Sequence, residues 1–208
     1  MLLIEIAHPA GRLTPADHDL LGEAVVGLFL APEGHAEETS VRARGATHIA
    51  FRELSGWRTG HGVPAADAAP PLIITVTVPR SWRDEAGGTF IGLLRHAVRR
   101  LDDARGWHRT EGSLWVRVVG VADGDIGLDG RPATGADVVD FLTEDFRSAL
   151  ANGSVAPPPA GKLLDPVCGM TVPDGRGAIV LEHDGRRWGF CAAGCRDAYL
   201  REHPAAVA

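Results

Sequence analysis

Residues 1–54 carry, in order, the apolar patterns of a strand, a helix and a second strand. Leu2–Ala7 is a short apolar run with a single acid, which is typical of a strand. The Thr-Pro-Ala-Asp sequence at Thr14–Asp17 indicates a helix start, because Thr caps, Pro suits the first helical position and Asp suits the first turn. One face of that helix then carries Leu20, Leu21, Ala24, Val25, Leu28 and Phe29. His48–Leu54 predicts the second strand, which runs into a glycine-rich turn.

The same order of elements recurs about 70 residues later. Leu72–Val78 is rich in Ile, Val and Thr and predicts a strand. Asp84–Arg105 has apolar residues at helical spacing, and Leu114–Val121 predicts the last strand. A strand–helix–strand connection crosses right-handedly and pairs its two strands in parallel. The predicted fold class is therefore α+β, with two tandem βαβ units forming a four-stranded sheet and two helices on one face.

A change in composition divides the chain near its last quarter. Gly135–Leu150 has the apolar spacing of a further helix, and Ala151–Gly161 is small, rich in proline and uncharged. Such a segment is typical of a semi-extended linker. We therefore expect a βαβ domain over residues 1–150, a Pro-rich linker over 151–162 and a small cysteine-rich module over 163–208.

Charge and hydropathy exclude several classes of partner. The formal net charge is −6 and no run of Lys or Arg exceeds two residues, so a basic nucleic-acid-binding face is not expected. No apolar stretch approaches the roughly 20 residues that cross a bilayer, so no membrane insertion is expected. The opening residues lack a basic segment, and no signal peptide is predicted. We expect a cytoplasmic protein whose thiols stay reduced.

All three cysteines, Cys168, Cys191 and Cys195, lie in the last fifth of the chain. If a helix starts near Cys191, its thiol and that of Cys195 share one face. Cys168 lies on a turn, and an Asp-Gly hairpin before Cys191 would bring the three sulfurs together. Thiolates suit Cu(I) or Zn(II). A closed Zn(II) site takes four ligands, so His203 is the best candidate for the fourth and His183 the second.

Two other interpretations of these cysteines stay open. Buried cysteines also act as small core side chains. Cys191 and Cys195 could instead form a disulfide, although their spacing differs from the C-x-x-C of thioredoxin-like redox sites. A module of this length has little core of its own and usually needs a metal or another staple, which favours the metal site.

The C-terminal segment contains Asp165–Met170, a Phe-Cys pair that ends in Cys191, and Cys195, with Tyr199 and Pro204 beyond. With these residues it resembles, over about residues 163–205, the YHS domain, a small heavy-metal-binding module related to the TRASH family. The resemblance implies transition-metal binding, with Cys168, Cys191 and Cys195 as the ligands. It does not identify the metal.

The N-terminal part has an opening strand followed by Arg12, a Trp/Gly turn in Glu53–Gly62 and a glycine-rich loop in Val121–Pro132. In these features it resembles, over about residues 1–132, the 4-oxalocrotonate tautomerase (MIF-like) superfamily in its fused, doubled form. The resemblance implies a homotrimer, with Arg12 at the position of a substrate-binding arginine. The family's base is an N-terminal proline, but position 2 is Leu2, and Pro71 in the second repeat is internal with a non-basic amide nitrogen.

Two function classes follow from these resemblances. The first is a cytoplasmic transition-metal-binding protein, in which the YHS module holds Cu(I) or Zn(II) on a tautomerase-like oligomeric scaffold. The second is an isomerase or tautomerase-like enzyme that acts on a small carboxylate, uses Arg12 and is regulated by metal binding. The missing proline base favours the first.

Overall fold

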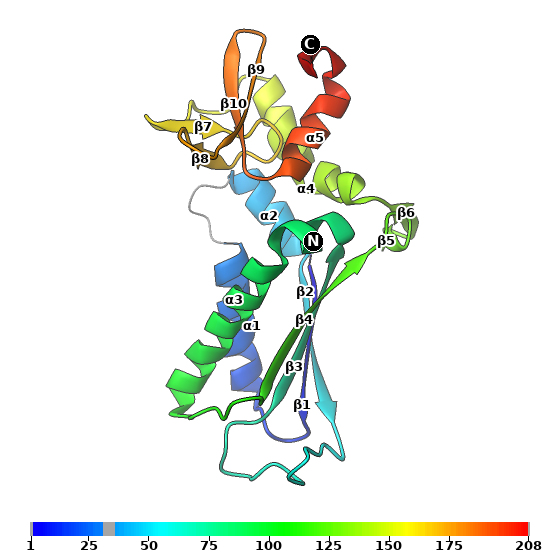
Figure 1. The fold of residues 1–208 in the computed structure, drawn as a ribbon, viewed down its shortest axis with the longest axis vertical. Coiled ribbons are helices and arrows are strands. Elements are labelled where there is room, and N and C mark those ends of the chain that lie inside the picture. The colour runs from blue at the N-terminus through cyan, green and yellow to red at the C-terminus, as the bar shows by residue number, and fades with distance from the viewer. Residues whose placement is uncertain (1, 31–35, 208) are drawn as a thin grey trace. The chain divides into compact units, whose positions relative to one another are not determined.

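The computed structural model describes residues 2–30 and 36–207, and its contacts form two compact units (Figure 1). The first, here called the sheet unit, consists of Leu2–Leu30 and Thr47–Val121. The second, here called the cysteine unit, consists of the described parts of Ala31–Ala46 and Ala122–Ala208. Each unit is therefore assembled from segments that are separated in the sequence.

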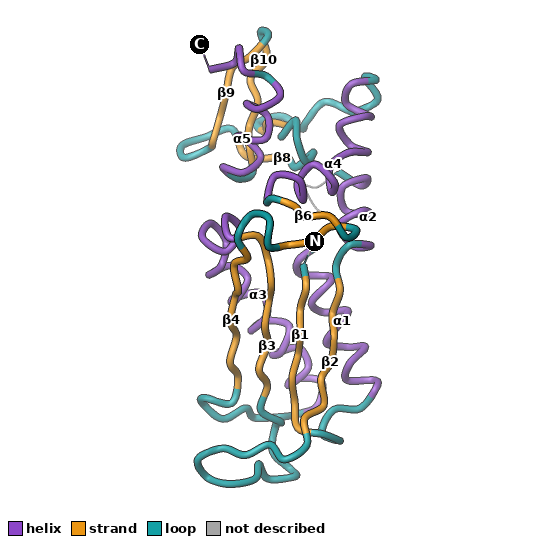
Figure 2. The backbone as a smooth tube through the Cα atoms, turned by 90° about the vertical axis from the view of Figure 1, so that its right-hand side faces the viewer, coloured by secondary structure: helices purple, strands orange, loops and turns teal. Residues whose placement is uncertain are grey.

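The sheet unit contains one four-stranded sheet and two helices, as its tandem strand–helix–strand patterns predict. The strands run in the order β2-β1-β3-β4 and the helices lie on one face (Figure 2). Strands β1 and β2 are parallel, as are β3 and β4, whereas β1 and β3 are antiparallel. The elements are β1 Leu3–Pro9, α1 Pro15–Phe29, β2 His48–Leu54, β3 Leu72–Pro79, α3 Arg80–Arg105 and β4 Leu114–Val121. These observations confirm the predicted α+β class.

The core of the sheet unit lies between one face of the sheet and the apolar faces of the two helices. Alternate residues of β1 and β3 face the helices, because side chains of a strand point to opposite faces of the sheet. Their partners on α1 and α3 recur every three or four residues. The fully or almost fully buried members include Ile4, Ile6, Leu21, Val25, Leu72, Ile74, Val76, Val78, Leu94, Ala97, Val98 and Leu101. Helix α3 begins at Arg80, four residues before the expected start, because Trp82 also packs against this core.

The cysteine unit is built from short elements. Three antiparallel pairs, β5–β6, β7–β8 and β9–β10, accompany the helices α2, α4 and α5. Their bounds are α2 Glu37–Gly45, β5 Ile126–Leu128, β6 Arg131–Ala133, α4 Gly135–Ala151, β7 Lys162–Leu164, β8 Thr171–Pro173, β9 Ile179–His183, β10 Arg186–Phe190 and α5 Ala193–Glu202, with a 3-10 turn at Pro204–Val207. The expected Asp-Gly hairpin is confirmed, with positive φ angles of 52° at Asp184 and 70° at Gly185.

Helix α2 has no counterpart among the elements expected from the sequence. It is strongly polar and buries only Ala43, so it lacks the apolar stripe that reveals a helix. Its anchor is Arg42, whose guanidinium donates hydrogen bonds to Asp145, Glu144 and the carbonyl of Phe141 on α4. Tertiary ion pairs therefore stabilise a helix that its own sequence does not predict.

Helix α4 contacts both α2 and α5 and so belongs to the cysteine unit by contacts. The expected boundaries placed it in a domain over residues 1–150, before a linker over 151–162. These boundaries for independently folding domains stay a prediction. Among the described residues, no helix combines the length and the apolar character that crossing a membrane requires.

Candidate metal centre

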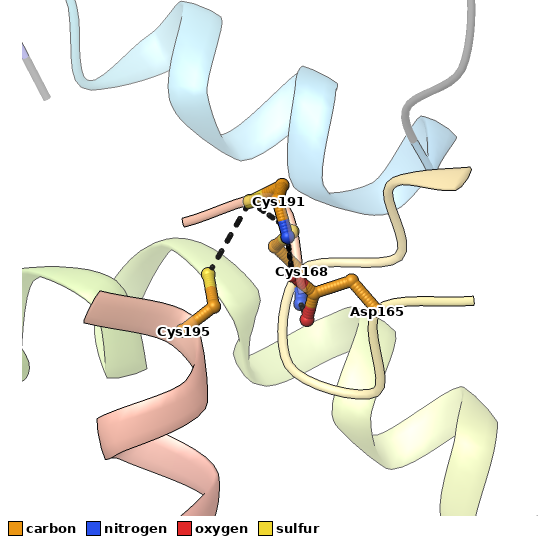
Figure 3. A group of neighbouring side chains, drawn as sticks. All are labelled: Asp165, Cys168, Cys191 and Cys195. Atoms are coloured by element: carbon orange, nitrogen blue, oxygen red, sulfur yellow. Dashed lines mark hydrogen bonds between the residues drawn. The ribbon is translucent and has the colours of Figure 1, made fainter. Parts of the chain in front are cut away.

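Three separate segments of the cysteine unit bring the cysteine side chains together (Figure 3). Cys168 lies in the turn between β7 and β8, Cys191 directly follows β10, and Cys195 lies in the first turn of α5. The Sγ atoms of Cys168 and Cys191 are 3.5 Å apart, and those of Cys191 and Cys195 are 3.6 Å apart. The structure thus gathers the three predicted ligands, and their role in binding a metal stays a prediction.

Cys191 is not in the helix that the sequence suggested. Helix α5 begins at Ala193, with extended backbone at Ala192 (φ −154°, ψ 157°), so Cys191 lies just outside the first turn. The hairpin β9–β10 positions it, because Phe190 at the end of β10 is buried and fixes the exit of that strand. The end of β10 and the start of α5 therefore bring the sulfurs of Cys191 and Cys195 close together.

A buried carboxylate ties two of the cysteine segments together. The Oδ1 atom of Asp165 accepts hydrogen bonds from the backbone N–H groups of Val167 at 2.9 Å and Cys168 at 3.3 Å. Its Oδ2 atom accepts from the N–H of Cys191 at 2.9 Å. The turn closes with the N–H of Gly169 donating to the Asp165 carbonyl at 2.9 Å. One side chain therefore sets the positions of two cysteine backbones.

Burial dominates the electrostatics of this group. It raises the pKa of Asp165 to about 6, with a further increase from the neighbouring Cys191 and a partial offset from the N–H groups that the carboxylate accepts. Hydrogen bonds with Cys191 and Cys195, together with burial, raise the pKa of the Cys168 thiol well above its usual value. Without a nearby cation the Cys168 thiol is protonated at neutral pH, and a bound metal ion would favour its thiolate.

Hydrogen bonding also sets the protonation of Cys195. The interaction with Cys168 lowers the pKa of the Cys195 thiol, but the interaction with Cys191 and burial outweigh it, so the pKa is raised. Both Cys168 and Cys195 are less than a tenth exposed. A cation that enters this group would therefore be largely shielded from water.

The spacing of the sulfurs fits a single metal ion. Sulfurs about 2.3 Å from one tetrahedral ion lie about 3.8 Å from one another. The observed distances of 3.5 Å and 3.6 Å are close to that value. Three thiols form a soft donor set, which suits Cu(I) or Zn(II) rather than Mg²⁺ or Ca²⁺.

Among the described residues, the group formed around the sulfurs includes neither of the two histidines expected as fourth ligands. His203 lies at the C-terminal end of α5, where its Nδ1 is 3.0 Å from the carbonyl of Tyr199 and its ring stacks on that tyrosine. Eight residues of helix correspond to about 12 Å, which separates His203 from Cys195. The Nδ1 of His183 is 2.8 Å from the Tyr199 hydroxyl.

The fourth potential ligand in the group is Asp165, which the sequence patterns did not single out. Its ligand atom and the three sulfurs lie within 4.8 Å of one another. The signal available in the sequence was its position three residues before Cys168, beside a proline that favours a turn. The carboxylate oxygens already accept three backbone N–H groups, so positioning the cysteines is its first role.

Arg12, the predicted substrate-binding residue, lies in the sheet unit just beyond the end of β1. Its Nη2 donates a 2.6 Å hydrogen bond to the carbonyl of Ala68. With Trp57 and Arg58 it lines an open hollow of about 470 Å³. The seven-residue strand β1 separates it from the buried Leu2, so within one chain Arg12 lies far from that residue. Its role in binding a substrate stays a prediction.

Comparison with known proteins gives similarity in fold only. No family model matches the sequence, and no curated protein sequence matches it. A solved "fused 4-OT wild type symmetric trimer" is 13% identical, with a TM-score of 0.47, and the match covers 64% of this chain and 98% of that one. A native fused 4-OT is 21% identical, with a TM-score of 0.46 over 63% of this chain and 95% of that one.

A third solved structure, N1 of the cis-3-chloroacrylic acid dehalogenase family, is 13% identical, with a TM-score of 0.46 over 72% of this chain and 99% of that one. Similarity at this level carries no inference about activity, ligand or assembly. The fold class rests instead on the strand order and helix placement observed in the chain itself.

Proposed function

We propose that this protein binds one soft transition-metal ion, Cu(I) or Zn(II), through Cys168, Cys191 and Cys195. The observation that carries the proposal is the convergence of the three sulfurs, at 3.5 Å and 3.6 Å, from a turn, a strand end and a helix start. The resemblance of residues 163–205 to the YHS domain supports the same ligands.

The two competing interpretations of the cysteines account less well for this geometry. A disulfide joins two sulfurs at about 2.05 Å and would leave the third thiol beside it unused. Three core cysteines would not need a buried carboxylate among them, because a buried charge is costly unless it is paired or hydrogen-bonded. Asp165, with its three backbone hydrogen bonds, is better explained as the group that positions the ligands.

The residues of the site have distinct tasks in this proposal. Cys168, Cys191 and Cys195 lose their protons and coordinate through sulfur. Asp165 holds the backbone of the first two at the required spacing. The metal ion, when bound, supplies the positive charge that stabilises the thiolates and joins the three segments. The burial of Cys168 and Cys195 limits access of water to the site.

We assign the sheet unit the role of a tautomerase-like oligomeric scaffold, and the proposed assembly is a homotrimer. On the sheet face opposite the helices, Leu3, Ile73, Trp115 and Val119 are exposed, with Trp115 at 68%. Exposed apolar side chains on one face mark a protein–protein contact. The unpaired edges of β2 and β4 also require cover, because open strand edges promote further pairing.

A second function, an isomerase or tautomerase-like activity on a small carboxylate, is favoured by one observation. Arg12 and Arg58 line the same hollow, and two guanidinium groups there could bind a carboxylate. The test is turnover of an enol-keto acid such as phenylenolpyruvate, compared between the unmodified protein and Arg12→Ala. Robust activity that is lost in Arg12→Ala would establish this function, and its absence would leave the metal-binding role.

The metal-binding proposal is tested with the full chain, reduced and free of oxygen. Addition of Co(II), a spectroscopic substitute for Zn(II), should produce sulfur-to-metal charge-transfer absorption. The Cys168→Ser/Cys191→Ser/Cys195→Ser variant should lose that absorption and bind one equivalent less of Cu(I). The control is His203→Ala, which should retain both signals because Nδ1 of His203 contacts the carbonyl of Tyr199 and His203 is not in the group formed by the sulfurs and Asp165. Unchanged binding in the triple variant would refute the proposal.

A further inference from the structure

A second group of potential metal ligands lies in the sheet unit and contains no cysteine. It consists of His8 on β1, His18 on α1 and Glu53 on β2. The Nε2 atoms of the two histidines are 3.1 Å apart, and one ligand atom from each of the three residues lies within 4.8 Å of the others. Strand pairing creates part of the group, because His8 and Glu53 are partners in the parallel β1–β2 ladder.

Hydrogen bonding fixes which nitrogen of His8 faces the group. Its Nδ1 is 3.0 Å from the carbonyl oxygen of Pro9, which can only accept, so Nδ1 carries the proton. The Nε2 of the neutral ring therefore presents its lone pair toward His18. A histidine that donates one ring N–H to a carbonyl and offers the other nitrogen is the usual arrangement of a metal ligand. His8 is fully buried, which holds this orientation.

The other two members, His18 and Glu53, are more accessible to solvent than His8. The ring of His18 stacks on Phe51 of β2, with centroids 4.1 Å apart and planes at 20°. This stacking holds its Nε2 toward His8. Glu53 is exposed, so its carboxylate can adjust to an ion that enters from solvent. The surroundings thus fix His8, stacking orients His18, and Glu53 can adjust its position.

The distance between the two imidazole nitrogens fits one shared ion. Nitrogens about 2.1 Å from a metal, at angles between octahedral and tetrahedral, lie about 3.0 to 3.4 Å apart. The observed separation is 3.1 Å. A direct hydrogen bond, in which His18 donates to Nε2 of His8, gives the same separation and is the competing interpretation that the test must address.

We propose that His8, His18 and Glu53 form a site for a divalent transition-metal ion such as Zn(II), separate from the cysteine site. Two imidazoles and one carboxylate suit Zn(II), Co(II) or Fe(II), whereas Cu(I) prefers the sulfurs. Three protein ligands leave at least one coordination position for water or a ligand. The proposal does not depend on metal binding by the cysteines.

The test uses the full-length Cys168→Ser/Cys191→Ser/Cys195→Ser variant, which removes the sulfur ligands. In equilibrium dialysis against ZnCl₂ this protein should bind one Zn(II) per chain. With CoCl₂ it should show visible d–d absorption without sulfur-to-metal charge transfer. His18→Ala and Glu53→Gln, added to this background, should each weaken Zn(II) binding about tenfold or more. His96→Ala, at an exposed position on α3, is the matched control and should change nothing.

The variants are chosen so that a loss of Zn(II) affinity cannot be confused with unfolding of the sheet unit. His8 is fully buried and its replacement could unfold the sheet unit, whereas His18 is half-buried and Glu53 is exposed. Unchanged circular dichroism in the His18→Ala and Glu53→Gln proteins would tie their loss of affinity to the site. No uptake of Zn(II) by the triple cysteine variant, or equal affinity in His18→Ala and His96→Ala, would overturn the proposal and leave the direct hydrogen bond as the explanation. The sulfur charge-transfer signal of the unmodified chain separately reports the cysteine site.

Discussion

The backbone N–H of Cys191 donates a 2.9 Å hydrogen bond to the carboxylate of Asp165, a residue 26 positions earlier in the chain. The same carboxylate accepts the N–H of Cys168. A single buried side chain therefore joins the turn after β7 to the end of β10, and it sets the spacing of two candidate ligands before any metal is bound.

Replacing Asp165 with Asn should weaken both the fold and the site. The Asn amide has one oxygen, so at least one of the three backbone N–H groups loses its acceptor. We expect a loss of about 1–3 kcal/mol in the free energy of unfolding, measured by urea titration with a chelator present. Affinity at the cysteine site should fall about 10- to 100-fold in competition with a chromophoric chelator.

The control for this prediction is Asp197→Asn, which changes an exposed acid on α5 that pairs only locally with Arg196. Exposed pairs contribute little, so this variant should match the unmodified protein. Equal stability and metal affinity in Asp165→Asn and Asp197→Asn would show that the carboxylate does not position the cysteines.

Replacing Gly169 with Ala should destabilise the cysteine unit more than the same change at Gly177. Both glycines have positive φ, 76° and 90°, so each substitution incurs backbone strain of about 1–2 kcal/mol. A Cβ at Gly169 would also lie only 2.7 Å from the Phe146 ring, whereas a Cβ at Gly177 meets open space. The overlap should add about 1–3 kcal/mol, measured by denaturant unfolding. Similar losses in the two variants would contradict the close packing at Gly169.

Asp17 should make the stability of the sheet unit sensitive to acid. Burial alone would raise its pKa, but hydrogen bonds from Arg105 and from the backbone and hydroxyl of Thr14 outweigh this and lower the pKa from 3.8 to about 2. The unfolded state then binds the proton more tightly. The contribution of Asp17 to the free energy of unfolding is fully present above about pH 4 and is lost as the pH falls toward 2.

The measurement is the free energy of unfolding as a function of pH in the unmodified protein and in Asp17→Asn. Asp17→Asn should be less stable than the unmodified protein at neutral pH. Its free energy of unfolding should also fall less than that of the unmodified protein between pH 4 and 2. Asp19→Asn, at an exposed position on the same helix, serves as control. A decline that is identical in all three proteins would exclude Asp17 as its source.

Trp115 should contribute to assembly through the exposed face of the sheet. It lies beside Ile73 in the parallel β3–β4 pair, and both side chains are exposed in the single chain. Light scattering should give three times the 22.0 kDa mass of the chain, and Trp115→Glu should dissociate the assembly by placing a charge on this face. Ile91→Glu, an exposed position on α3, is the control. A monomeric unmodified protein at micromolar concentration would contradict the homotrimer.

Local patterns in the sequence determine much of the fold. The apolar runs of β1 and β3, the capping signals at Thr14–Asp17 and the Asp-Gly hairpin before β10 each depend on neighbours within a few residues. The repetition of strand, helix and strand is enough to predict a four-stranded sheet with two helices on one face. The clustering of three cysteines toward the end of the chain indicates a thiol site, although Cys168 and Cys191 are 23 positions apart.

Only the tertiary structure decided which distant residues meet. The partnership of His8 with Glu53 depends on the register of β1 against β2, and that of Asp165 with Cys191 on the packing of a turn against a hairpin. Helix α2 contacts α4 through the hydrogen bonds of Arg42, and its own sequence has no apolar stripe that would predict it. Spacing along a helix or strand fixes local geometry, whereas contacts between segments depend on how the whole chain buries its apolar surface, and that information is not contained in any short pattern.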